Sequence, residues 1–169
     1  MTSFSSFIRQ ARLLQVFSLL VCIGSAGAKT VNWPQFRGSG ASGIAEGFDT
    51  ATTWDVPKSK NLKWKTPIPG LGHSCPVVWG DRVFLTTAVS DREKDSLKIG
   101  IYHEIAPVEN DGPHTWILYC IDKKTGKVIW ERVCHKGVPK DKRHTKSSHA
   151  NCTPATDGKH VVSFFGSEG

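Results

Sequence analysis

One pattern of strand and turn residues occurs twice in the sequence, and this recurrence limits the possible folds more than any other feature. Pro76 is followed by Gly80, a basic residue and an apolar run, and Pro154 is followed in the same order by Gly158, a basic residue and an apolar run. An apolar segment with a tryptophan, Trp64 or Trp130, precedes each copy. A recurring order of elements is typical of repeat architectures, in which each unit buries its faces against its neighbours. We therefore expect consecutive copies of one unit of three or four strands.

The segments between the turn residues have the composition of β-strands. β-Branched and apolar residues dominate them, and Gly-Asp, Asp-Lys-Lys-Thr-Gly and Asp-Gly sequences separate them. Three hairpins are predicted: 76–79 with 82–89, 114–121 with 127–133, and 154–155 with 161–165. No sustained helical period occurs after Lys29. The predicted fold class is all-β.

The first 28 residues are predicted to be a secretory signal peptide. Arg9 and Arg12 precede an apolar run over 13–23, which ends in the small residues 25–28. The run is short for a membrane span, although an uncleaved anchor or a lipoprotein modified at Cys22 is an alternative. We therefore expect export to the periplasm, the cell envelope or the medium, with membrane attachment only under those alternatives.

Charge and cysteine content exclude several functions. The 169 residues carry 22 basic and 15 acidic side chains, and removal of the signal peptide lowers this basic excess. The basic stretch 136–146 lacks interleaved aromatic residues, so no nucleic-acid partner is expected. No Cys-x-x-Cys motif is present, which disfavours a thioredoxin-like site and covalent haem. An oxidising compartment would permit any of three pairings among Cys75, Cys120, Cys134 and Cys152.

Two stretches have the character of long loops, which are the usual place for binding residues in a repeat protein. Residues 90–113 are acidic, and residues 135–149 are basic with three histidines. His73 and His149 each stand shortly before the recurring proline, so they could line one pocket in which Arg143 and Lys146 attract an anion. The alternative is a solvated basic loop with hydrogen-bonded histidines. The candidate ligand-binding residues are His73, Arg143, Lys146, Ser147, His149 and Asn151.

Metal-binding and catalytic motifs are weak. His135, His144 and His149, with Cys134 or Cys152, are ligand types for zinc or copper, but their spacing matches no closed zinc module. The acidic loop lacks the Asp-x-Asp-x-Asp-Gly pattern of a calcium loop. No Gly-x-Ser-x-Gly elbow is present, and the Gly/Ser/Ala-rich stretch that ends at Gly47 is interpreted as a flexible loop, not as a phosphate-binding loop that leads into a helix. No metal site is predicted, and catalytic residues are unknown.

The segment Asp122-Lys-Lys-Thr-Gly-Lys-Val-Ile-Trp130, preceded by apolar residues, closely resembles the repeat motif of the PQQ-like (pyrroloquinoline quinone-like) β-propeller family. The segment 32–38, Asn-Trp-Pro-Gln-Phe-Arg-Gly, also resembles the mature N-terminus of exported bacterial members, and the resemblance extends over 31–169. It implies a propeller of antiparallel four-stranded blades, about two to three of them in this chain. It also implies that the repeat tryptophan packs between blades. The residues at repeat positions are Trp64, Trp130, Asp122, Thr125 and Gly126.

This resemblance implies a domain order and two possible functions. Residues 1–28 would be the signal peptide, 29–60 a loop-rich lead-in and 61–169 incomplete propeller repeats. The first hypothesis is the N-terminal part of an exported binding or scaffold protein without a cofactor, whose partners are a protein or small ligand at the loops and the remaining blades. Expressed alone, such a part is expected to aggregate or self-assemble.

The alternative is a fragment of a PQQ-dependent alcohol or sugar dehydrogenase, which would bind PQQ and Ca²⁺. That branch of the family is expected to have adjacent cysteines, a calcium-binding Glu and Asn, and a catalytic Asp. No adjacent cysteine pair occurs in this sequence, and no aspartate matches a catalytic motif. Under this alternative, those residues would lie beyond Gly169.

Overall fold

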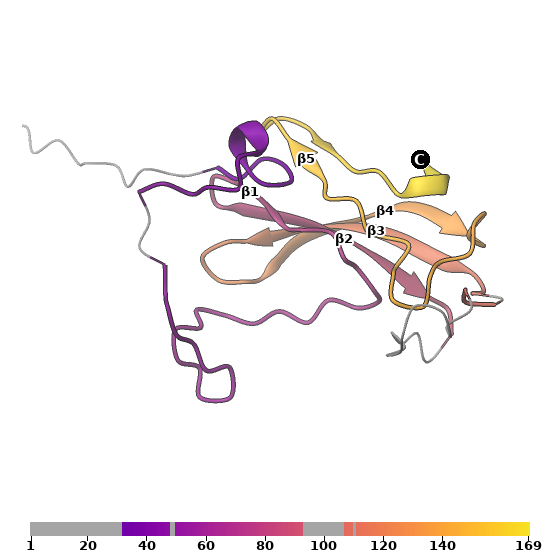
Figure 1. Cartoon of the computed structure of the whole chain (residues 1–169), viewed down its shortest axis with the longest axis horizontal. Coiled ribbons are helices and arrows are strands. Elements are labelled where there is room, and N and C mark those ends of the chain that lie inside the picture. The colour runs from indigo at the N-terminus through magenta and orange to yellow at the C-terminus, as the bar shows by residue number, and fades with distance from the viewer. Residues whose placement is uncertain (1–31, 48–49, 93–106, 110) are drawn as a thin grey trace, which may run out of the picture.

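A four-stranded antiparallel sheet forms the centre of the protein in a computed structural model, which describes residues 32–47, 50–92, 107–109 and 111–169 (Figure 1). The strands are β1 (Val77–Trp79), β2 (Arg82–Ser90), β3 (His114–Asp122) and β4 (Val128–Gly137), and they pair in the order β1-β2-β3-β4. A hairpin of β5 (Ala155–Thr156) and β6 (Val161–Val162) forms a second small sheet. The helical elements in these ranges are the 3-10 turns η1 (Ser39–Ala41) and η2 (Gly166–Glu168). The regular structure of the described residues is thus mostly strand, as an all-β chain requires.

The predicted signal peptide, residues 1–28, lies outside the described residues. In the part of the chain that the structure describes, no helix combines the length and the apolar character needed to cross a membrane.

The first two predicted hairpins are confirmed, and local chemistry explains their turns. Trp79 pairs with Arg82, so Gly80 and Asp81 form a two-residue turn between β1 and β2. Gly80 has a φ of 57°, a conformation that glycine adopts without a steric cost. Between β3 and β4, Oδ1 of Asp122 accepts hydrogen bonds from the backbone N–H groups of Lys124 and Thr125 at 3.0 and 2.7 Å. This side chain therefore sets the turn, as the Asp-to-Gly sequence predicts.

The third hairpin also forms, but its first strand extends to Thr156 and its second strand is shorter than predicted. Thr156 pairs with Val161, so the turn contains four residues rather than the two of an Asp-Gly turn. Oδ1 of Asp157 accepts the backbone N–H groups of Lys159 and His160 at 2.8 and 2.7 Å. The carboxylate thereby stabilises a wider turn, and β6 ends at Val162 instead of continuing to 165.

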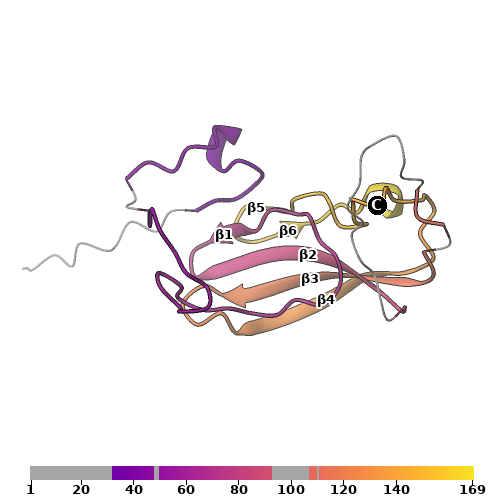
Figure 2. The same ribbon diagram turned by 60° about the horizontal axis from the view of Figure 1, so that its bottom comes forward.

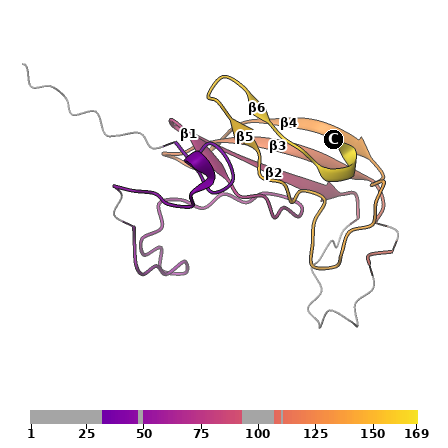
Figure 3. The same cartoon turned by 45° about the horizontal axis from the view of Figure 1, so that its top comes forward.

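Each face of the sheet carries its own apolar cluster, because side chains alternate along the strands. One cluster is built on Val77, Phe84, Leu118 and Cys120, and the β5–β6 hairpin covers it through Val161. Figures 2 and 3 show this hairpin lying along one side of the sheet. The opposite cluster is built on Val83, Ile117, Tyr119 and Ile121, and Trp64 and Ile68 of the preceding segment pack against it. A sheet that is apolar on both faces needs a covering layer on each.

The repeat tryptophans lie on opposite faces of this sheet. The indole N–H of Trp64 donates to the carbonyl of Lys123 at 2.8 Å, and its ring lies against Gly126, where a Cβ atom would be 2.6 Å from the ring. Trp130 belongs to the other face, with its ring centroid 6.0 Å from that of Phe84. Asp122, Thr125 and Gly126 therefore form a turn on which the earlier tryptophan packs.

The outer strand β4 leaves apolar side chains in solvent. Val128 and Val133 are 43% and 51% exposed, and they pair with Ile121 and Ile117 across the strands. Cross-strand partners share a face of a sheet, so both valines extend the face that Trp64 covers only in part. Phe164, which follows β6, is likewise 54% exposed.

The four cysteines in the described part are free thiols, so none of the three possible disulfide pairings is formed in this structure. Cys120 lies in the buried cluster that the β5–β6 hairpin covers, whereas Cys75 and Cys134 are exposed. Burial raises the pKa of the Cys120 thiol.

Candidate functional site

Two loops meet at the end of the sheet where β3 begins. One consists of residues 107–109 and 111–113, which precede β3, and the other is the loop 138–154 between β4 and β5. The backbone N–H of Val108 donates to the carbonyl of Arg143 at 3.0 Å. The indole N–H of Trp116, in β3, donates to the carbonyl of His149 at 3.1 Å. These contacts hold the second loop against the first strand residues of β3.

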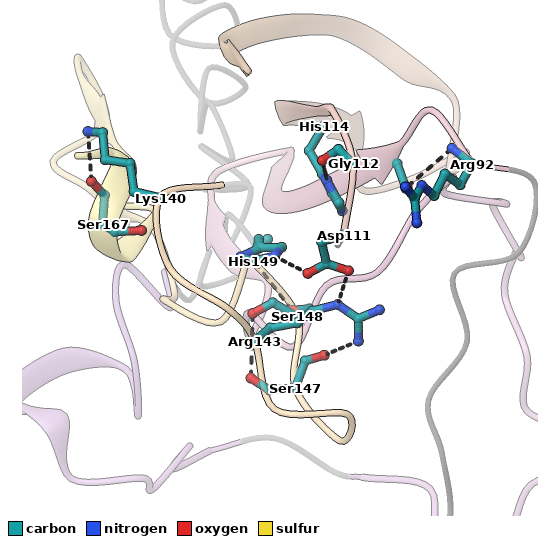
Figure 4. A network of polar contacts seen from close by, with 12 residues as sticks. Arg92, Asp111, Gly112, His114, Lys140, Arg143, Ser147, Ser148, His149 and Ser167 are labelled. Atoms are coloured by element: carbon teal, nitrogen blue, oxygen red, sulfur yellow. Dashed lines mark hydrogen bonds and ion pairs between the residues drawn. The ribbon is translucent and has the colours of Figure 1, made fainter. Parts of the chain in front are cut away.

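A buried carboxylate lies at the centre of this junction (Figure 4). Oδ1 of Asp111 accepts a hydrogen bond from Nε of Arg143 at 3.2 Å, and Oδ2 lies 2.6 Å from Nε2 of His149. The side chains of Asp111, Arg143 and His149 are only 6%, 4% and 10% exposed. A buried charge requires such partners, because removing it from water is otherwise costly.

His114 completes a compact group of metal-ligand side chains. Its Nδ1 lies 3.0 Å from the carbonyl oxygen of Gly112, and its ring centroid is 5.0 Å from that of His149. Asp111, His114 and His149 each contribute one atom to a set within 4.8 Å of one another. Among the described residues, this group is the one that combines three side chains able to hold a metal ion.

A local hydrogen-bond network shapes the loop that carries His149. Oδ1 of Asn151 accepts from the backbone N–H and the hydroxyl of Ser148 at 3.2 and 3.0 Å, and its amide donates to Oγ of Ser147 at 2.8 Å. Nη1 of Arg143 donates to the carbonyl of Ser147 at 3.2 Å. Short polar side chains that bond to nearby backbone are typical of such turns. These bonds join residues on both sides of His149 within the loop.

The η2 turn also contacts the loop 138–154, through Lys140. The backbone N–H of Lys140 donates to Oε1 of Glu168 at 2.9 Å, and its ammonium donates to the carbonyl of Ser167 at 3.0 Å. Nε2 of His135 lies 3.5 Å from Oε2 of Glu168. Burial acts to raise the pKa of Glu168, but the hydrogen bond from Lys140 and other favourable contacts outweigh it, so the pKa is lowered.

A cavity of about 250 Å³ lies between this loop and the η2 turn. Four of the six predicted ligand-binding residues line it: Arg143, Ser147, His149 and Asn151. Lys146 belongs to the same loop, and its backbone N–H donates to Nδ1 of His144 at 3.1 Å, but its side chain does not line the cavity.

His73 is exposed and is not among the lining residues, although its backbone N–H donates to the carbonyl of Ala150 at 3.0 Å. The two recurring segments thus lie side by side, as the sequence repeat predicts, but the histidine side chains do not share the cavity. The guanidinium of Arg143 forms an ion pair with the Asp111 carboxylate. The positive charge that we expected to attract an anion is therefore already paired within the protein.

The sequence pattern does not single out Asp111 and His114. Asp111 falls within a stretch that has the composition of a solvated acidic loop, and His114 is the first residue of a predicted strand. The sequence does contain one indication of this pair. Asp111 and His114 are three residues apart at the start of a predicted strand, so both side chains lie at the same end of that strand.

The alternative zinc or copper set does not gather in the structure. His135 lies beside Trp116 and Glu168, and the Sγ atom of Cys134 lies 3.9 Å from Oγ of Ser163. Of the residues in that set, only His149 belongs to the described metal-ligand group.

Comparison of the chain with protein-family models, with curated proteins and with solved structures finds no match.

Proposed function

We propose that this protein is a binding scaffold in which β1–β4 form one blade of a β-propeller and β5–β6 begin the next. The observation that carries the proposal is the presence of an apolar cluster on each face of one antiparallel meander. A propeller blade has this character, because it lies between two neighbouring blades. The resemblance of residues 122–130 to the PQQ-like repeat motif supports the same assignment.

The coverage of the two faces supports this arrangement. The β5–β6 hairpin, which follows the sheet in sequence, packs on one face, and the segment around Trp64, which precedes it, packs on the other. Both covers are partial, since Val128 and Val133 remain about half exposed on the Trp64 face and Phe164 beyond the hairpin is also half exposed. In the proposed ring, a neighbouring blade completes each cover.

The binding role rests on the loops at the end of the sheet. They bring a buried ionic group and a polar cavity of about 250 Å³ together on a rigid strand end. Binding residues are commonly found on loops that a rigid scaffold positions. The partner would be a protein segment or small ligand that reaches the loop 141–152, and the scaffold itself needs no cofactor.

The test is the association state of the full chain with one substitution on the exposed face. Val133→Lys places a charge on the apolar surface, and Glu131→Gln is its control. Residues 131 and 133 lie on the same face of β4, and both substitutions raise the net charge by one. We expect sedimentation velocity to show self-association of the wild type and of Glu131→Gln, and less of it in Val133→Lys. A monodisperse wild-type monomer with a sharp cooperative melt would refute the proposal.

The dehydrogenase alternative gains no support from the site. Ca²⁺ in that branch takes oxygen ligands, whereas the described group offers two imidazoles and one carboxylate. These residues therefore do not fit the calcium ion that would hold PQQ.

A further inference from the structure

We infer that Asp111, His114 and His149 bind one divalent transition-metal ion of the zinc class. This inference goes beyond the scaffold proposal and does not depend on ring closure, because all three side chains belong to the described chain itself. It concerns a different ligand set from the histidine and cysteine residues that the sequence pattern suggested.

The geometry of the three ligand atoms is close to that of a metal site. They lie within 4.8 Å of one another. Zinc binds imidazole nitrogen at about 2.0–2.1 Å and carboxylate oxygen at about 2.0–2.2 Å, so ligand atoms around one ion are about 3–4 Å apart. Nε2 of His149 and Oδ2 of Asp111 are 2.6 Å apart and would move apart slightly, while a pair at the 4.8 Å limit would have to close by about 1 Å.

Outer contacts already orient each ligand. Nδ1 of His114 bonds to the carbonyl of Gly112, which requires the tautomer with its lone pair on Nε2. The indole of Trp116 holds the backbone of His149, and Arg143 holds Oδ1 of Asp111. Metal-bound histidines and carboxylates are characteristically oriented by such second contacts to carbonyls, carboxylates and donors.

The donor set selects the class of ion. Two imidazoles and one carboxylate suit Zn²⁺, Co²⁺ or Ni²⁺, whereas Mg²⁺ and Ca²⁺ prefer oxygen ligands. Three protein ligands leave a coordination position for water, as in open zinc sites. In the metal-bound form, Nε2 of His149 and Oδ2 of Asp111 would turn from each other to the ion, and the neutral imidazole would carry its proton on Nδ1. The positive charge of Arg143 beside Asp111 opposes a second cation, so the affinity is expected to be moderate.

The competing explanation is a purely structural ionic cluster. Arg143, Asp111 and His149 satisfy one another without a metal, and they join the loop 138–154 to the start of β3. This explanation predicts no saturable metal binding at these residues, so the two can be separated by experiment.

The experiment titrates the purified full chain with Co²⁺ and follows its visible absorption, with Zn²⁺ added afterwards as a competitor. The site variants are Asp111→Asn and His149→Gln, and the matched control is His73→Gln, which changes an exposed histidine in the neighbouring segment. We expect one Co²⁺ per chain in the wild type and in the control, displaced by Zn²⁺, and a loss of affinity of about tenfold or more in each site variant. Circular dichroism checks that each variant is folded.

A second measurement needs no variant. X-ray absorption of the Zn²⁺-loaded wild type should show imidazole and oxygen ligands at about 2.0–2.1 Å and no sulfur at about 2.3 Å. Sulfur ligands would place the ion on cysteines and overturn the inference. Absence of saturable binding to the folded wild type, or binding that the folded site variants leave unchanged, would also overturn it.

Discussion

The contact between Trp64 and Gly126 is predicted to stabilise the whole sheet, and a single methyl group can test it. Gly126 has a φ of +75°, and a Cβ at this position would lie 2.6 Å from the indole ring of Trp64. The substitution Gly126→Ala therefore has two costs. The left-handed backbone conformation costs an alanine about 1–2 kcal/mol. The methyl group also displaces an indole whose N–H donates to Lys123 at 2.8 Å.

The second cost can be estimated from the contacts that move. A net hydrogen bond is worth about 0.5–1.5 kcal/mol, and part of the indole packing is lost with it. The total for Gly126→Ala is then about 2–4 kcal/mol. Gly80→Ala is the matched control, because Gly80 has a φ of +57° and a methyl group there would have no heavy atom within 4 Å. Gly80→Ala should therefore lower the free energy of unfolding only by the cost of the left-handed backbone conformation, about 1–2 kcal/mol.

Urea unfolding followed by circular dichroism measures both variants. With an m-value of about 2 kcal/mol per molar urea, Gly126→Ala should lower the midpoint by about 1–2 M, and Gly80→Ala by about half as much. In a Trp64→Ala background, Gly126→Ala should cost no more than Gly80→Ala, because the ring that it displaces is gone. Equal effects of the two glycine substitutions, or an undiminished cost in the Trp64→Ala background, would refute the reasoning.

Three further predictions concern charged and thiol side chains. Asp111→Asn places a neutral amide opposite a buried guanidinium, so it should lower the free energy of unfolding by about 3–5 kcal/mol, measured by urea unfolding. Hydrogen bonds from the backbone and ring of His160 lower the pKa of Asp157 to about 2, so NMR should find its titration near that pH. Its contribution to stability is complete above about pH 4 and is lost as the pH falls through about 2. Cys134 should react rapidly with a thiol reagent and Cys120 only on unfolding, because burial covers its sulfur and raises its pKa; equal rates in the folded chain would contradict this.

The strand positions could be predicted from the sequence because they depend on local chemistry. Alternating apolar residues set the faces of β2 and β3, and the turns at Gly80 and Asp122 follow from a glycine conformation and an aspartate that accepts backbone N–H groups. The width of the turn at Asp157 could not be predicted, because two- and four-residue turns both use an Asp-Gly pair, and the hydrogen bonds to Lys159 and His160 decide between them.

Part of the candidate site could be predicted in the same way. Ser147, His149 and Asn151 are close in sequence, so one loop carries all three, and the amide of Asn151 donates to Oγ of Ser147 within it. The position of His73 could be predicted only at the backbone level. The repeat places its segment beside Ala150, but a repeat of backbone elements does not fix where each side chain points.

The sequence by itself determined the β-rich character of this protein, its main turns and the loop that carries His149, since each depends on residues that are neighbours in the chain. Tertiary structure decided which face of the sheet Trp64 covers and which carboxylate pairs with Arg143. It also placed Asp111 and His114 beside His149. These contacts join segments separated by tens of residues. They form only when β3 and the loop after β4 pack together and exclude water, because burial then requires each charge to find a partner.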